Sequence, residues 1–291
     1  MRAAVLGHPI AHSLSPVLHT AAYAALGLDW RYDAVDVTAE GLPAFVADLD
    51  DGWAGLSLTM PLKQAVLPLL HHVEPLAAAV GAVNTVLVQA GGSRPTLVGA
   101  NTDVHGIAAA LGEAGVARDA GDVRRAVVLG GGATASSTLA GLAELGMPSA
   151  TVLVRSVARA GGTLRAAHRM GVDAAVRTLA PLDRAVQAIA AADVVVSTLP
   201  PGAADDIAGA LRGPVRGVLL DCAYTPRPTS LITAWQRAGG RAVSGERMLL
   251  HQAAEQVRLM TGRAAPLAAM AAALEAALGG DADTAAVAAR V

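Results

Sequence analysis

The chain alternates between short apolar runs and longer amphipathic stretches along most of its length. Apolar runs of about four to six residues that end near glycine, proline or a polar side chain predict β-strands. Stretches with apolar residues every three or four positions predict α-helices. The predicted strands cover 2–7, 31–37, 54–58, a run from 84, a run ending near 101, 126–129, 151–155, 174–179, 193–197 and 217–222. The predicted helices cover 16–26, 40–50, 62–80, 104–115, the stretch from the glycines to about 145, 181–191, 246–262 and 266–278. Such alternation is typical of α/β folds with mainly parallel sheets.

The length of 291 residues predicts two domains, each large enough for its own hydrophobic core. We place the first domain at 1–103 plus 245–291, because the last two helices follow the second sheet and are expected to pack back on the first. The second domain covers 104–244 and is predicted to be a doubly wound, Rossmann-type sheet.

The strongest local pattern is a glycine-rich turn between a predicted strand and a predicted helix. Residues 126–129 are apolar, and the loop then reads Gly130, Gly131, Gly132, Ala133, Thr134 and Ala135. This spacing fits the G-x-G-x-x-G/A pattern, in which glycines let the backbone approach a pyrophosphate at the start of a helix. A plain glycine turn in any α/β protein is the alternative.

Composition and charge narrow the class of partner to a small molecule. The net charge is −2 and aromatic residues make up 2% of the chain, which supplies neither the basic face nor the stacking surface of a nucleic-acid binder. The single cysteine, Cys222, excludes an internal disulfide, and no apolar run is long enough to predict a membrane span. We therefore expect a cytoplasmic protein.

Two rare residue types stand out. Lys63 is the only lysine among 22 basic residues, and Asn84 and Asn101 are the only asparagines. A chain that otherwise uses arginine retains lysine where an amine must release a proton, which guanidinium cannot do near neutrality. We therefore predict that Lys63 is catalytic, with a solvated lysine at a helix end as the alternative.

Polar side chains follow the predicted strands, where open α/β sheets bind their ligands. Ser13 and Ser15 follow the first strand, Thr59 and Lys63 the third, and Asp103 the run that ends near 101. Ser15 before Pro16 is also a suitable helix N-cap, as is Asp103 before its helix, so capping is the alternative for both. His8, His12 and His19 lack the spacing of metal ligands, and we predict no metal site.

The end of the strand at 151–155 favours NADP over NAD. An NAD-binding Rossmann domain usually has an acidic residue there, which binds the ribose hydroxyls. This chain instead has Arg155, Ser156 and then Arg159. A planar cation beside a hydroxyl suits a 2′-phosphate. Surface arginines without a ligand are the alternative. Cys222, at the end of a later strand, is expected to be a small buried residue and not a nucleophile.

Seven motifs together resemble the shikimate dehydrogenase family in order and approximate spacing. The motifs are GHPIAHSLSPVLH (7–19), LTMPLK (58–63), GAVNTV (81–86), NTD (101–103), the glycine loop, the Arg155–Ser156 turn and GERMLLHQA (245–253).

The resemblance implies an NADPH-dependent, reversible reduction of 3-dehydroshikimate to shikimate, a step in aromatic amino-acid biosynthesis. It also implies a substrate domain and a Rossmann domain with the reaction in the cleft between them. Lys63 and Asp103 would form the catalytic pair. The substrate carboxylate would be bound by Ser13, Ser15 and Tyr224. The ring hydroxyls would be bound by Thr59, Asn84, Gln252 and Asp103. The cofactor would be held by Gly130, Gly131, Gly132, Ala133 and Thr134 at the pyrophosphate, by Arg155, Ser156 and Arg159 at the adenosine phosphate, and by Cys222, Gly245 and Met248 near the nicotinamide.

Three positions depart from the family pattern. Thr20, Ser57 and Val154 stand where the family commonly has asparagine. A quinate/shikimate dehydrogenase or a paralogue acting on an aminated analogue therefore stays an alternative, as does a non-catalytic NADP-binding regulator. We expect a monomer or a homodimer.

Overall fold

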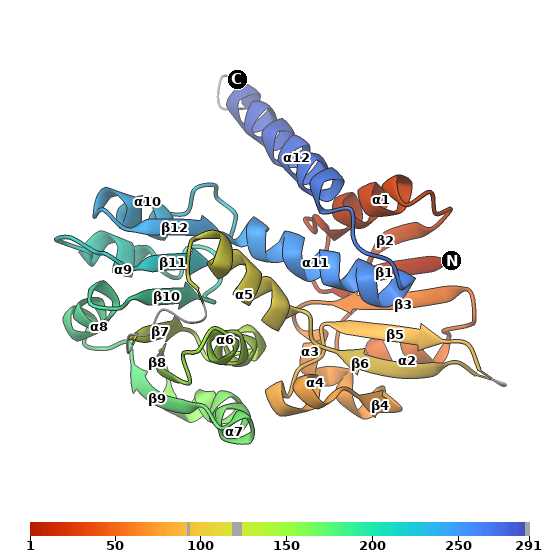
Figure 1. Ribbon diagram of the computed structural model, residues 1–291, viewed down its shortest axis with the longest axis horizontal. Coiled ribbons are helices and arrows are strands. Elements are labelled where there is room, and N and C mark those ends of the chain that lie inside the picture. The colour runs from red at the N-terminus through yellow and green to blue at the C-terminus, as the bar shows by residue number, and fades with distance from the viewer. Residues whose placement is uncertain (92–93, 118–123, 289–291) are drawn as a thin grey trace. The chain divides into compact units, whose positions relative to one another are not determined.

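The computed structural model describes residues 1–91, 94–117 and 124–288, with the side chains of the last helix described as far as residue 279 (Figure 1). The chain divides into two compact units. Unit 1 contains Met1–Ala77, Val83–Thr102 and Leu249–Val291, and unit 2 contains Ala78–Ala82 and Asp103–Met248.

Unit 1 contains a mixed six-stranded sheet in the order β2-β1-β3-β5-β6-β4. Its strands are β1 (Arg2–Gly7), β2 (Arg31–Asp36), β3 (Trp53–Leu58), β4 (His72–Val73), β5 (Thr85–Gln89) and β6 (Thr96–Ala100). Strands β2, β1 and β3 run parallel, β5 is antiparallel to both β3 and β6, and β4 is parallel to β6. The carboxyl ends of β1, β3 and β6 therefore lie at the same sheet edge as the amino end of β5.

The helices of unit 1 cover both faces of this sheet. They are α1 (Ser15–Ala25), α2 (Leu42–Ala47), α3 (Leu62–Ala65), the 3-10 turn η1 (Leu67–Leu69), α4 (Pro75–Val80), α11 (Gly245–Thr261) and α12 (Leu267–Ala288), of which α4 and α11 each extend into unit 2. Successive residues of β1 enter different apolar clusters, because side chains alternate across a strand: Ala4 packs with Leu62, and Val5 packs with α1, α11 and α12.

Unit 2 is a six-stranded parallel sheet in the order β12-β11-β10-β7-β8-β9. Its strands are β7 (Ala126–Leu129), β8 (Ser149–Val154), β9 (Asp173–Thr178), β10 (Val194–Ser197), β11 (Val218–Asp221) and β12 (Arg241–Ser244). Its helical elements are α5 (Asp103–Glu113), α6 (Ala133–Glu144), η2 (Val157–Ala160), α7 (Gly161–Met170), α8 (Leu182–Ala190), α9 (Asp205–Ala210) and α10 (Ser230–Arg237). The strand order reverses between β7 and β10, as in doubly wound dinucleotide-binding sheets. The predicted α/β class with a Rossmann-type sheet is confirmed.

The helix predicted at 62–80 is wrong. The structure divides this stretch into α3, η1, β4 and α4, and prolines explain the breaks. Pro68 lies in the first turn of η1 and Pro75 begins α4. A proline has no amide hydrogen to donate and its ring collides with the preceding turn, so one continuous helix cannot form across both positions.

The N-cap role given as the alternative for Ser15 is not found in the structure. Ser15 is the first helical residue of α1, and no side chain caps the helix from Leu14. Instead the Ser13 hydroxyl accepts a hydrogen bond from the Ser15 amide at 3.3 Å. The helix begins one residue earlier than predicted because Pro16 is tolerated anywhere in a first turn, where its missing donor has no partner to lose.

Candidate functional site

The glycine loop has the predicted strand, turn and helix geometry. Gly130 follows β7 with φ of +106°, and a Cβ there would stand 2.4 Å from Thr198 Oγ1. At Gly132 nothing lies within 4 Å of a Cβ, so this residue faces open space at the start of α6. The Thr163 hydroxyl fixes the loop from the side by donating to the Gly131 carbonyl at 2.8 Å. Contacts with Thr198 and Thr163 thus fix Gly130 and Gly131, whereas the space beside Gly132 is open.

A pocket of about 250 Å³ opens beside this loop, within unit 2. It is lined by Gly130, Gly131, Gly132, Val154, Arg155, Ser156, Arg159, Ala160, Thr198, Leu199 and Pro200. The structure therefore brings the glycines together with both predicted arginines, and the lining contains no acidic side chain. Amide groups at a helix start and two guanidinium groups favour an anion. These residues suit a dinucleotide with a phosphate on its adenosine ribose.

The residues predicted near the nicotinamide gather at the ends of β10, β11 and β12. The Cys222 amide donates to the Ser197 carbonyl at 2.8 Å, and its sulfur lies 3.6 Å from Met248 Sδ. A Cβ at Gly245 would stand 2.2 Å from the Cys222 carbonyl oxygen, so only glycine fits this contact. Cys222 is half-buried and in contact with the Met248 thioether.

Tyr224 lies on the loop after β11, and two carboxylates hold this loop. Asp221 accepts from the Thr229 hydroxyl at 2.8 Å and from the Ala223 amide at 3.4 Å. Glu246, 3% exposed, forms an ion pair with Arg227, whose Nε lies 3.1 Å from Oε1, and accepts a hydrogen bond from the Ser244 hydroxyl. Burial raises the pKa of the Tyr224 phenol, and the charge of Glu246 raises it further.

Asp221 was missed by the sequence analysis, although an acid at the end of an apolar strand is a visible signal. Its side chain is 3% exposed, and burial raises the pKa of its carboxyl. The hydrogen bond from Thr229 offsets part of that rise. Thr229 in turn caps α10 by accepting from the Ile232 amide, so Asp221 ties the strand end to the next helix.

In unit 1 the predicted substrate residues occupy the sheet edge described above. Ser13 and Ser15 follow β1, and Thr59 follows β3, with its amide donating to the Leu6 carbonyl at 2.9 Å. Lys63 is half-buried in α3, and its carbonyl accepts from the Val83 amide at 2.8 Å. The segments that carry these four residues therefore leave one edge of one sheet.

Asn84 is the most constrained of the predicted substrate residues. It is 1% exposed, and its side-chain oxygen accepts from the Thr102 amide at 2.8 Å. Its side-chain nitrogen donates to Thr102 Oγ1 at 2.9 Å and to Gln252 Oε1 at 3.3 Å. The structure thus brings together Asn84 and Gln252, and it fixes Thr102, the residue immediately before Asp103.

Lys63 and Asp103 belong to different units. Lys63 lies in unit 1, whereas Asp103 begins unit 2, is 2% exposed and occupies the first turn of α5. The predicted pairing of these two side chains therefore stays a prediction.

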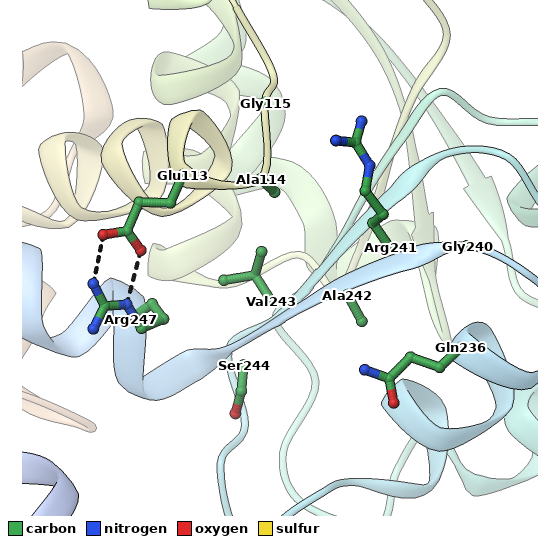
Figure 2. A pocket seen from close by; sticks show the side chains of 10 residues that line it. All are labelled: Glu113, Ala114, Gly115, Gln236, Gly240, Arg241, Ala242, Val243, Ser244 and Arg247. Carbon is green, nitrogen blue, oxygen red and sulfur yellow. Dashed lines mark hydrogen bonds and ion pairs between the residues drawn. The ribbon is translucent and has the colours of Figure 1, made fainter.

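A second hollow in unit 2, of about 670 Å³, contains none of the predicted site residues (Figure 2). It is lined by Glu113, Ala114, Gly115, Gln236, Gly240, Arg241, Ala242, Val243, Ser244 and Arg247. Figure 2 shows Glu113 and Arg247 joined as a two-pronged ion pair on one side of it, with N to O distances of 2.7 and 2.5 Å. This hollow lies outside the predicted site.

Within the described ranges, no three His, Cys, Asp or Glu side chains gather closely enough to hold a metal ion. Across that same part of the chain, no helix combines the length and the apolar character needed to cross a membrane.

The sequence matches two family models. Residues 5–86 match the shikimate dehydrogenase substrate binding domain, and residues 245–275 match the shikimate 5′-dehydrogenase C-terminal domain. A curated shikimate dehydrogenase (NADP(+)) from Moorella thermoacetica is 37% identical to this chain over 291 residues, covering 95% of this chain and 93% of the relative.

Solved structures agree with this match. The shikimate dehydrogenase of Mycobacterium tuberculosis superposes with a TM-score of 0.83 at 42% identity, covering 94% of this chain and 99% of that one. The shikimate 5-dehydrogenase of Thermus thermophilus, in complex with NADP(H) and shikimate, gives 0.77 at 34% identity, covering 95% and 99%. A quinate dehydrogenase from Corynebacterium glutamicum, in complex with NAD, gives 0.81 at 28% identity, covering 95% and 99%. Because the likeness in sequence and in fold extends along nearly the whole chain, this protein belongs to the shikimate dehydrogenase family.

Proposed function

We propose that this chain is an NADP-dependent shikimate dehydrogenase, which catalyses the reversible reduction of 3-dehydroshikimate to shikimate. The observation that carries the proposal is the 37% identity to a curated shikimate dehydrogenase (NADP(+)) over 95% of the chain. The pocket beside the glycine loop supports the choice of cofactor, because it offers Arg155 and Arg159 to a phosphate and no acid to a ribose hydroxyl.

The chemistry requires a proton donor beside the reacting ketone. NADPH, when bound, supplies a hydride to the carbonyl carbon, and the carbonyl oxygen then gains negative charge. The Lys63 ammonium would stabilise that charge and donate the proton that completes the alcohol. In the reverse direction the neutral amine would accept this proton. Asp103 would orient the amine and a ring hydroxyl.

The remaining residues would bind and orient the substrate. Ser13 and Ser15 follow β1 near the start of α1, where two hydroxyl groups and the positive end of the helix dipole suit a carboxylate. Tyr224 would add a third contact to that group. Thr59, Asn84 and Gln252 would accept or donate hydrogen bonds to the ring hydroxyls.

An absorbance assay tests the proposal directly. The purified protein is mixed with shikimate and NADP⁺, and NADPH formation is followed at a series of substrate concentrations. We expect turnover with this pair, and a kcat/KM at least about tenfold lower when NAD⁺ replaces NADP⁺, because a charge-assisted hydrogen bond lost from an arginine site costs about 1.5–3 kcal/mol. The absence of turnover with either nucleotide would contradict the proposal.

A quinate dehydrogenase is the second candidate, since a quinate dehydrogenase shares the fold with a TM-score of 0.81. The same assay with quinate distinguishes the two functions through the ratio of the kcat/KM values. An aminated analogue is tested in the same way. Thermal stabilisation by NADPH without turnover of any of these acids would instead indicate a non-catalytic regulator.

We further propose that the protein works in the cytoplasm as a monomer or a homodimer. The single cysteine supports a reducing compartment, because it cannot form an internal disulfide. Light scattering coupled to gel filtration measures the oligomeric state.

A further inference from the structure

A chain of buried polar side chains crosses the interior of unit 1. We call it the Gln256 network, and its members are Tyr32, Ser57, Gln256, Thr85 and Asn84, with His19 as a side branch. These residues come from α1, β2, β3, β5 with the residue before it, and α11. All six are at most 6% exposed.

Gln256 is the centre of the network and uses every hydrogen-bonding position of its amide. Its Oε1 accepts from Ser57 Oγ at 2.8 Å and from His19 Nε2 at 3.2 Å. Its Nε2 donates to Thr85 Oγ1 at 3.0 Å and to the Asn84 carbonyl at 3.2 Å. Burial lowers the pKa of His19 to about 4, so its ring is neutral near pH 7 and Nε2 can donate. The amide therefore has one compatible orientation.

One end of the network reaches residues predicted to bind the substrate. At one end the Tyr32 hydroxyl donates to Ser57 Oγ at 2.6 Å. At the other end Thr85 Oγ1 donates to Asn84 Oδ1 at 2.9 Å, and Asn84 Nδ2 donates to Gln252 Oε1 at 3.3 Å. The network thus connects Tyr32 and Ser57, on two strands of the sheet, with Asn84 and Gln252, the predicted ring-hydroxyl contacts.

Anchoring of α11 in the core does not require this polarity. Leu250, Ala253 and Val257, on the same helix, already pack in the apolar cluster with α1 and β1. A buried amide contributes to stability only when its partners are present, and each partner left unsatisfied costs about 1–3 kcal/mol. A satisfied buried network of this kind specifies one arrangement of the groups that it joins.

We propose that Gln256 is a positioning residue for the substrate face of unit 1. It does not touch the substrate but fixes Asn84, and through Asn84 it fixes Gln252, which lies one turn earlier on the same face of α11. This inference rests on the proposed function. Its consequence is a selective one: loss of the amide weakens the binding of shikimate and leaves the binding of NADP⁺ unchanged, because the pocket beside the glycine loop belongs to unit 2.

The test is Gln256→Met, which keeps the length of the side chain and removes its hydrogen bonds. We expect the KM for shikimate to rise roughly tenfold or more, since small misplacements of binding groups have effects of this size. The KM for NADP⁺ should stay within about twofold, because no group in that pocket is joined to the network. Tyr32→Phe is the second variant. It keeps the ring that stacks on His19 at 4.0 Å and removes the hydroxyl link, so it tests the network even if the first variant does not fold.

Val257→Ala is the matched control, because Val257 is the next residue of α11 and is completely buried in the apolar cluster. We expect it to lower the melting temperature without changing the KM for shikimate. An unchanged shikimate KM in both Gln256→Met and Tyr32→Phe, or an equal rise in the control, would overturn the inference. Wild-type protein without turnover of shikimate would instead overturn the proposed function, and this inference with it.

Discussion

At the scale of single residues, two glycines of the glycine loop are required for different reasons. The fold of unit 2 requires a glycine at position 130, since φ is +106° there and a Cβ would collide with Thr198 Oγ1. Gly132 has no such constraint, because nothing lies within 4 Å of its Cβ position. The small size of Gly132 is explained if a pyrophosphate approaches the open space at the start of α6.

Two alanine variants separate these constraints. Gly130→Ala should destabilise the protein by about 1–3 kcal/mol, because a side chain in this backbone region is strained. Gly132→Ala should leave the free energy of unfolding unchanged and raise the KM for NADP⁺ by at least about tenfold, because the methyl group would occupy space needed by the cofactor. Chemical denaturation and steady-state kinetics measure the two effects. Normal NADP⁺ binding in Gly132→Ala would mean that the pyrophosphate does not approach there.

Lys63 illustrates a residue whose chemistry can be inferred from its rarity. We expect Lys63→Ala to lower kcat by about 10²- to 10⁴-fold, the usual contribution of a positioned acid or base, with a smaller change in the KM for shikimate. Lys63→Arg should lower kcat to nearly the same extent, because guanidinium cannot release a proton near neutrality. Circular dichroism checks that both variants fold. Near wild-type turnover in either variant would remove Lys63 from the mechanism.

His19 is a buried base whose titration should be visible in stability. Burial lowers its pKa from 6.5 to about 4 in the folded protein, while the hydrogen bond to Gln256 partly opposes that shift. The unfolded chain therefore binds more protons than the folded one between these values. Stability contributed by neutral His19 is complete above pH 6.5 and falls by about 3 kcal/mol as the pH drops to 4.

Denaturation by urea at several pH values checks this expectation. His19→Gln should show a shallower loss of stability between pH 6.5 and 4 than the wild-type protein. His12→Gln, at an exposed position of the adjoining loop, serves as the control and should keep the wild-type profile. Equal profiles for all three proteins would contradict the assigned shift.

At the scale of elements, the sequence predicts those features that short-range patterns determine. The apolar runs of β7, β8, β10 and β11 predict buried parallel strands, and all four are present. The stretch 62–80 fails, because Pro68 and Pro75 override its helical periodicity. Gln256 could not be found from the sequence, because its partners lie up to 237 positions away along the chain. Its four-residue spacing from Gln252 was the only available signal.

The turn after β8 carries the prediction about cofactor choice. Arg155→Asp should raise the KM for NADP⁺ at least about tenfold, because a carboxylate repels the 2′-phosphate. The KM for NAD⁺ should change less, since an acid at this strand end can accept the ribose hydroxyls. Arg184→Asp is the control, because Arg184 is an exposed arginine on α8 outside the pocket. An equal change in the KM for NADP⁺ and the KM for NAD⁺ would mean that Arg155 does not bind the 2′-phosphate.

At the scale of the whole molecule, one unit is formed almost entirely by a single continuous segment of the chain, and the other is formed by segments far apart along it. The chain passes between them after residues 77, 82, 102 and 248. Apart from Ala78–Ala82, unit 2 is one continuous segment that contains its two larger apolar clusters and the pocket beside the glycine loop, whereas a smaller cluster joins Val80 and Ala82 to Val104 and Ala140. Unit 1 is discontinuous, because Val5 and Leu18 pack against Leu250, Val257 and Leu274 from the end of the chain.

This difference predicts how fragments behave. The fragment 103–248 should unfold cooperatively and bind NADP⁺ in calorimetry, since it retains the two larger apolar clusters and the whole pocket and lacks only Val80 and Ala82 of the smaller cluster. The fragment 1–102 should not fold alone, because it lacks α11 and α12 and would expose the apolar surface that they cover. Joining 1–102 to 249–278 through a short glycine-serine linker should restore cooperative unfolding, because the linker replaces unit 2 only as a connection. Cooperative folding of 1–102 by itself would show that the two final helices are dispensable for the core of unit 1.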